Sequence, residues 1–266
     1  MSTHSTDAQS LLLTADHLAP LPLSAQRLTR LMQDPRCDLE EITRTLRLDL
    51  ALAGQVIGAA NISFAASEEP ISTVEDATRR LGGATILEMI QRGLQLEQRI
   101  ALDAPADSGE GLLWKHSILC ALATEGIEHF AKTRVLPDTF AAALLHDLGS
   151  LVLARQQRVE LISPQLHADL GAQLARRWGL PARICTAIEK HHSPLAAPDA
   201  DSRRLCSQVL LSEAVAAELG QSLEHGEPVR FTPELAGSLG LSRRGFDGLC
   251  AETDARYRGV MHSYAA

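Results

Sequence analysis

Several features are missing or scarce in this sequence of 266 residues, and each absence narrows the range of functions. The chain carries 25 lysines and arginines against 33 aspartates and glutamates, which gives a formal net charge of -8, and it has no dense basic run. This acidic balance argues against a nucleic-acid groove or an anionic membrane surface as the partner. We therefore expect a protein or small-molecule partner, with no direct binding of nucleic acid and no membrane association.

The cysteines and the N-terminal residues argue against a secreted, disulfide-stabilised protein and against a membrane-spanning one. The five cysteines form no C-x-x-C pair, and their odd number does not fit a disulfide framework, so a reducing cytosol is expected. The first residues lack a basic segment followed by a long apolar stretch, and nowhere do about 18 apolar residues run without charges. These absences predict a cytoplasmic protein with neither a secretion signal nor a membrane span.

Sustained apolar-polar alternation with β-branched residues is also absent, whereas apolar residues recur at helical spacing along the chain. The pattern predicts an all-α fold. Three short helices are expected between Leu23 and Ile57, and another begins after Ser72 or Thr73 and ends at Gly82. Later helices are predicted over residues 84–100, 112–132, 141–156, 165–178, 181–192, 203–220 and 243–258.

The segment ALDAPADSGEG, residues 101–111, has the composition of a linker and predicts a subdomain boundary. The expected parts are an N-terminal arm 1–17, a main domain 18–220 divided into a helical subdomain 18–104 and a bundle 105–220, and a C-terminal extension 221–266.

The stretch AAALLHDLGSLVL, residues 141–153, places His146 and Asp147 in an otherwise apolar helical run. Neighbouring residues of a helix point about 100° apart. The two side chains can therefore share one ion only if it lies between their directions and other helices supply further ligands. The alternative is a polar pair at the edge of a core helix, each member satisfied by one hydrogen bond.

Further residues of metal-ligand type lie on successive predicted helices of the C-terminal half. The complete candidate set is His116, His146, Asp147, His167, His191, His192 and Glu213. A dinuclear hydrolase centre needs imidazoles for borderline metals, a carboxylate that bridges two cations, and an open position for water. Each residue also has a structural interpretation: His116 fills space after Trp114, His167 is exposed, and His191 with His192 sits at a helix C-terminus, where the dipole favours a cation.

The order of these residues resembles that of the HD superfamily of metal-dependent phosphohydrolases, and the flanking residues resemble its HDOD branch. The resemblance extends over five blocks in family order, about residues 18–220. They are LAPLPLSAQRLTRLMQDPRCDLEEITRTLRLDLALAGQVIGAAN, ISTVEDATRRLG, LLHDLG, HADLGAQLARRWGLPARICTAIEKHHSP and SEAVAAELG. The resemblance implies an HD-like multi-helix bundle with an N-terminal helical subdomain.

The chain departs from the catalytic relatives of the HD-GYP type at three places. Those relatives commonly read His-Asp-x-Gly-Lys, whereas Ser150 occupies the lysine position here, so a phosphate-facing cation is missing. Glu213 stands where the last ligand is usually Asp, and the GYP block is absent from the loop after His192. Hydrolysis of cyclic-di-GMP is thereby disfavoured.

The resemblance leads to a regulatory signal-transduction module that binds a protein or small ligand without catalysis. A signalling protein is the expected partner, and homodimerisation is left open.

The competing hypothesis is a phosphodiesterase or nucleotide phosphatase with Asp147 as its catalytic residue. His116, His146, Asp147 and Glu213 would then hold one or two metals, and His167 with His191 or His192 would hold the second metal or the phosphate. Fe, Mn or Mg would occupy a full or vestigial site. A third hypothesis is a pseudoenzyme in which one structural metal stiffens the bundle.

Overall fold

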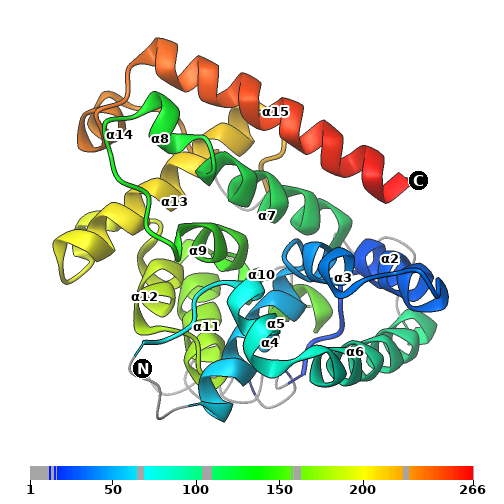
Figure 1. The fold of residues 1–266 in the computed structure, drawn as a ribbon. Coiled ribbons are helices and arrows are strands. Elements are labelled where there is room, and N and C mark those ends of the chain that lie inside the picture. Colours follow the sequence, from blue (N-terminus) through cyan, green and yellow to red (C-terminus); the bar gives the residue numbers. More distant parts are fainter. Residues whose placement is uncertain are drawn as a thin grey trace.

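The structure is a computed structural model that describes residues 12, 15, 17–64, 69–103, 110–156, 158, 163–223 and 228–265. In these residues every regular element is a helix, and pairing between extended segments is limited to one isolated bridge, Ala131 with Leu241 (Figure 1). The predicted all-α fold is confirmed. The first helices are α2 (Pro22–Gln33), α3 (Leu39–Leu46), α4 (Leu50–Ser63), α5 (Val74–Leu81) and α6 (Gly83–Asp103).

The second half of the chain adds helices that surround the candidate residues. They are α7 (Glu110–Thr124), α8 (Ile127–Phe130), α9 (Thr139–Leu145), α10 (Leu148–Arg155), α11 (Pro164–Arg177), α12 (Ala182–Lys190), the 3-10 turn η2 (Pro194–Ala196), α13 (Ala200–Glu218), α14 (Pro233–Leu239) and α15 (Arg243–Ala265). The predicted arm 1–17 falls almost wholly outside the described residues.

Side-chain caps set the starts of many of these helices, because a cap oxygen accepts a bond from an otherwise unpaired backbone N–H. Thr73 caps α5, as one of the two predicted alternatives, and Gly82 ends that helix with a φ of 79°. The residues whose side chains cap a helix in this way are Asp38, Asp49, Thr73, Ser163, Asp199 and Thr232.

Two predicted helices are interrupted. The helix predicted over 141–156 is split into α9 and α10, with His146 and Asp147 in the turn between them, because Asp147 leaves the helical region at φ -97° and ψ 21°. The helix predicted over 112–132 is split into α7 and α8. Its break allows close packing at Gly126, where a Cβ would lie 2.8 Å from a methyl carbon of Leu249 on α15.

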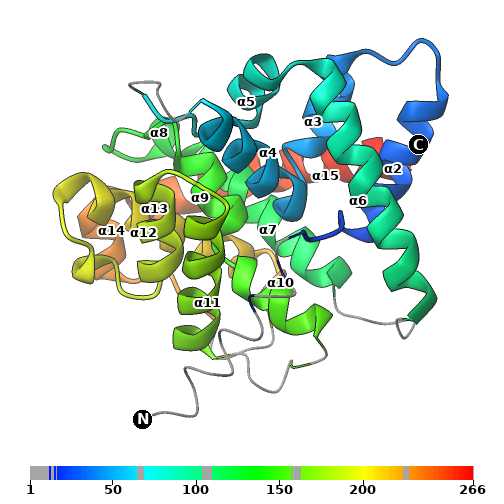
Figure 2. The same ribbon diagram turned by 90° about the horizontal axis from the view of Figure 1, so that it is seen from below.

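The apolar core joins helices from both sides of the predicted linker. One buried cluster combines Leu50 and Ile57 of α4 with Trp114 of α7, Leu145 of α9 and Trp178 at the end of α11. Figure 2 shows α4 between α6 on one side and α9 on the other. A second cluster lies among α7, α13, α14 and α15. Residues 104–109 lie outside the described part of the chain, and the division of the domain there stays a prediction.

Asp49 offers a test of how the first helices are held. It is fully buried, and its carboxylate accepts bonds from the backbone N–H of Leu52 at 2.9 Å and of Leu21 at 2.8 Å. We predict that Asp49→Ala lowers the free energy of unfolding by about 2–4 kcal/mol, because it removes a cap and leaves a buried N–H unpaired. Urea denaturation measures the loss.

The matched control is Asp38→Ala, which removes the exposed aspartate cap of α3. Water can replace that bond, so the expected loss is about 1 kcal/mol or less. Equal losses in the two variants would contradict this account of Asp49.

Candidate metal centre

Six of the seven candidate residues meet inside the bundle, and the seventh, Glu213, lies on a helix that packs against α7 and α9. His116 lies on α7, His146 and Asp147 in the turn between α9 and α10, and His167 on α11. His191 and His192 follow α12, and Glu213 lies on α13. Six of them are buried and His192 is exposed. His167 is only 5% exposed, so the alternative of an exposed surface histidine is wrong for it.

The first group of ligand atoms contains His116 and His146. Their Nε2 atoms are 3.2 Å apart, and Cys120 belongs to the same group, whose ligand atoms all lie within 4.8 Å of one another. The Oδ2 atom of Asp147 lies 3.5 Å from His116 Nε2 and 3.2 Å from His146 Nε2.

The second group is formed by three histidines. The Nε2 atom of His167 lies 3.2 Å from that of His191 and 3.1 Å from that of His192. The other oxygen of Asp147, Oδ1, is 3.2 Å from His167 Nε2. One carboxylate thus presents one oxygen to each group, which is the arrangement of a carboxylate that bridges two cations.

Backbone carbonyls determine which ring nitrogen of each buried histidine carries the proton. A carbonyl oxygen can only accept, so each Nδ1 that contacts one must be an N–H donor, and Nε2 of the neutral ring keeps its lone pair. All four contacts measure 2.7 Å: His116 to Gln221, His146 to Ala143, His167 to Ser163, and His191 to Ile188.

Two neutral imidazoles that face each other through lone pairs repel, so the short Nε2 pairs require a proton or a metal ion between them. Nitrogens at 2.0–2.1 Å from a tetrahedral ion would be about 3.3 Å apart. The observed separations of 3.1–3.2 Å are close to this value. The donor set therefore fits divalent metal ions in both groups.

The electrostatics of the centre are set by the buried Asp147 carboxylate and the imidazole rings around it. Burial disfavours the charged form of Asp147, but His146 and the neighbouring imidazoles outweigh it and hold the pKa of that carboxyl well below its usual range. Burial likewise opposes protonation of His146, yet Asp147 and Glu213 raise its pKa to about 9. Burial and the charge on His146 lower the pKa of His116 to about 4. Without metal, the pair His116 and His146 therefore holds one proton beyond the two Nδ1 protons, and that proton lies on His146.

Glu213 lies beside the first group. Burial raises the pKa of its carboxyl to about 7, against the attraction of His146. Within the described residues, its buried Oε1 atom accepts no hydrogen bond. An unpaired buried oxygen is costly, so Glu213 has an unmet need for a hydrogen-bond donor or a cation within the described part of the chain.

Sequence analysis missed two residues of the centre. Cys120 follows His116 by four positions, which places both on one face of α7, and this spacing was the available signal. Ser150 was treated only as the replacement of a lysine. Its hydroxyl donates to Asp147 Oδ1 at 3.0 Å and so orients the bridging carboxylate.

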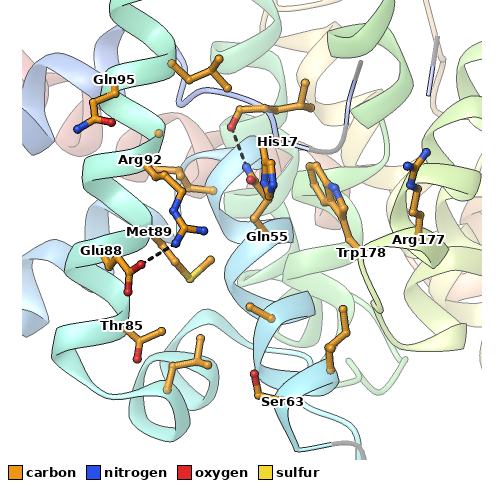
Figure 3. Close-up of a pocket in the computed structure, with 17 residues that line it drawn as sticks. His17, Gln55, Ser63, Thr85, Glu88, Met89, Arg92, Gln95, Arg177 and Trp178 are labelled. Carbon is orange, nitrogen blue, oxygen red and sulfur yellow. Dashed lines mark hydrogen bonds and ion pairs between the residues drawn. The ribbon is translucent and has the colours of Figure 1, made fainter. Parts of the chain in front are cut away.

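A separate groove of about 730 Å³ lies between the N-terminal helices and the end of α11. Figure 3 shows Arg92 and Met89 of α6 on one side, Gln55 of α4 in the middle, and Trp178 opposite. Gly58 permits this arrangement, since a Cβ there would overlap the backbone carbonyl of Trp178. Grooves of this volume, largely apolar with a few polar groups, are typical ligand sites.

The all-α bundle and its His/Asp cluster define an HD-type helical domain. The sequence pattern of the HDOD domain matches residues 18–194, and the chain belongs to the HDOD domain family. Among the described helices, none combines the length and apolar character needed to cross a bilayer.

The individual proteins to which this chain is similar share less than a quarter of their aligned residues with it. The chain is 24% identical over 205 residues to an uncharacterized protein of Treponema pallidum (strain Nichols), a match that covers 69% of this chain and 39% of that protein's length. The solved structure of the MmoQ response regulator from Methylococcus capsulatus is similar, with a TM-score of 0.68, 21% identity, and coverage of 88% of this chain and 98% of that one. The solved structure of a virulence factor from Campylobacter jejuni is also similar, with a TM-score of 0.65 and 12% identity. That match covers 94% of this chain and 99% of the other chain.

Gly149 tests how the turn after Asp147 is packed. A Cβ at this position would overlap the carbonyl oxygen of His167 and lie 2.8 Å from the backbone nitrogen of Gly171. We predict that Gly149→Ala forces α10 and α11 apart and lowers the free energy of unfolding by about 3 kcal/mol. Thermal or urea denaturation measures the effect.

Gly237→Ala on α14 is the control, because its Cβ would meet no atom within 4 Å. Alanine is the better helix former, so this variant should gain about 0.5–1 kcal/mol. If both variants changed stability in the same direction, the close contact at Gly149 would be refuted.

Proposed function

We propose that this protein is a regulatory signalling module of the HDOD type, which binds a protein or small ligand and does not turn over a substrate. The observation that carries the proposal is the position of Ser150. It is buried, and its hydroxyl is committed to the Asp147 carboxylate rather than to a phosphate. Phosphoryl transfer needs cationic groups around the equatorial oxygens as charge builds there.

The electrostatic surroundings of the cluster support this interpretation. The charged groups that dominate at Asp147 are His146, His167 and His116, and those at Glu213 are His146 and Asp147. No lysine or arginine is among these groups in the described part of the chain. Among these groups, a phosphate would find only protonated histidine, besides bound metal, for its neutralisation.

Metal binding is part of the proposal. His116, His146 and Asp147 would hold one ion, with Glu213 beside them, and His167, His191, His192 and Asp147 would hold another. Such a nitrogen-rich set suits Fe or Mn better than Mg, which prefers oxygen ligands. A bound dication polarises a phosphate and lowers the pKa of its water. In the regulatory interpretation the ion instead stabilises the junction of α7, α9 and α11.

The groove of Figure 3 is the proposed binding surface, because it lies between the N-terminal helices and the end of α11 and its lining includes none of the seven candidate ligands. Its lining combines the apolar Met89 and Trp178 with the polar groups of Gln55 and Arg92. The name of the similar MmoQ protein, a response regulator, agrees with a regulatory role. A signalling protein remains the expected partner.

The second candidate function is a metal-dependent phosphohydrolase, with Asp147 as its central residue. The observation in its favour is the complete ligand set, since both histidine groups converge and one carboxylate faces each of them. Metal ions could supply much of the charge that a lysine would otherwise provide.

Removal of metal tests the binding part of the proposal. We predict that Fe²⁺ or Mn²⁺ returned to chelator-treated protein raises the melting temperature, with a gain of about 2.7 kcal/mol when free metal is about 100 times the dissociation constant. Asp147→Asn should lose this gain. Asp138→Asn, which alters the buried partner of Arg183, should keep it. An unchanged melting temperature in wild-type protein would contradict metal binding.

A turnover assay separates the two functions. With Mn²⁺ or Fe²⁺ and a generic chromogenic phosphodiester, we predict no detectable hydrolysis, because the cluster has no cation at the position of Ser150. The comparison is between wild-type protein and Asp147→Asn, both shown to be folded by circular dichroism. Hydrolysis that is present in wild-type protein and absent from the variant would establish the phosphohydrolase and overturn the regulatory proposal.

A further inference from the structure

The first ligand group contains a thiol. Cys120 lies one turn after His116 on α7 and is fully buried, and its Sγ atom is 3.6 Å from His116 Nε2. The ligand atoms of Cys120, His116 and His146 all lie within 4.8 Å of one another. The sulfur thus belongs to the same cluster of ligand atoms as the two imidazole nitrogens.

The two separations that involve His116 match those around one tetrahedral ion. With a metal–sulfur distance of about 2.3 Å and a metal–nitrogen distance of about 2.05 Å, sulfur and nitrogen would be about 3.6 Å apart and two nitrogens about 3.3 Å apart. The corresponding distances here are 3.6 Å for Cys120 to His116 and 3.2 Å for His116 to His146. A thiol hydrogen bond to His116 has a similar length, so the test must distinguish the two.

Glu213 is a second and independent sign of a ligand at this place. Its side chain comes from α13 on another side of the cluster, is 8% exposed, and has a buried Oε1 atom with no partner among the described residues. Its carboxylate acts electrostatically on His146, and burial together with this carboxylate raises the pKa of the Cys120 thiol well above its usual range, so a thiolate there needs a bound cation beside it. A cation there would satisfy the facing lone pairs and offset the charge of this carboxylate.

We infer that Cys120 is a thiolate ligand of the metal held by His116 and His146, a role that rests on the proposed metal binding. Coordination replaces the sulfur–hydrogen bond by a sulfur–metal bond, and the thiol proton is released to solvent. The two positions then differ in kind. The first offers sulfur, two nitrogens and Asp147 Oδ2 and selects a thiophilic ion such as Zn²⁺, and the second offers three imidazoles and Asp147 Oδ1.

The inference is tested with Co²⁺, which takes the same ligands as Zn²⁺ and reports a thiolate ligand by a charge-transfer absorption in the near ultraviolet. Full-length protein, freed of metal by a chelator, is titrated with Co²⁺. We predict that this band grows with one equivalent of bound ion, is abolished in Cys120→Ala and Cys120→Ser, and is retained in Cys206→Ala. Cys206 is an equally buried cysteine outside both histidine groups.

A competition titration with Zn²⁺ gives a second readout. Loss of a direct ligand should weaken Zn²⁺ binding at the first position by roughly tenfold to hundredfold or more, since even the loss of an outer hydrogen-bond partner costs this much. Mn²⁺ binding should change less, because manganese has little preference for sulfur.

The outcomes separate this inference from the proposed function. Co²⁺ that binds wild-type protein without the band, or a band that persists in both Cys120 variants, overturns the thiolate role and leaves metal binding intact. Wild-type protein that binds no Co²⁺ overturns both. The spectrum of wild-type protein can refute the thiolate role by itself, so the test remains decisive even if a variant misfolds.

Discussion

The Asp147 carboxylate lies between two groups of imidazoles, with one oxygen directed to each, and the rest of the centre depends on this contact. His146 and His167 approach the two oxygens at 3.2 Å from opposite groups. A buried carboxylate and so many converging lone pairs would be costly without positive charge among them. Either shared protons or metal ions must supply it, and the spacing of the nitrogens suits metal ions.

The scaffold holds this arrangement through its backbone. The break between α9 and α10 frees His146 and Asp147 from the angular separation of a regular helix, and Ser150 orients the carboxylate from the next turn. Carbonyls of the adjoining helix ends and loops bond the Nδ1 atoms, so every buried ring presents Nε2 to the centre. Close packing at Gly149 then brings α11, with His167, against this turn.

Most helices were predictable from the sequence, because apolar periodicity and caps such as Thr73 are local signals. The candidate residues are also identifiable from the sequence, and the structure brings all of them except Glu213 into contact, although their role as ligands stays a prediction. The break at Asp147 was missed because an apolar run on both sides looks like one helix. The contribution of Cys120 was missed because a buried thiol is common in cores, and only tertiary contacts reveal that it faces His116 and His146. The groove at Trp178 likewise depends on contacts between distant segments.

Anomalous X-ray diffraction from crystals of protein purified without chelator or metal-affinity resin tests the central claim most directly. The account predicts metal density between His116 and His146, and between His167 and His191, with an Asp147 oxygen on each ion and metal–nitrogen distances of about 2.0–2.2 Å. Crystals soaked in Mn²⁺ or Zn²⁺ that show no anomalous peak at either position, with the paired Nε2 atoms still in contact, would contradict it.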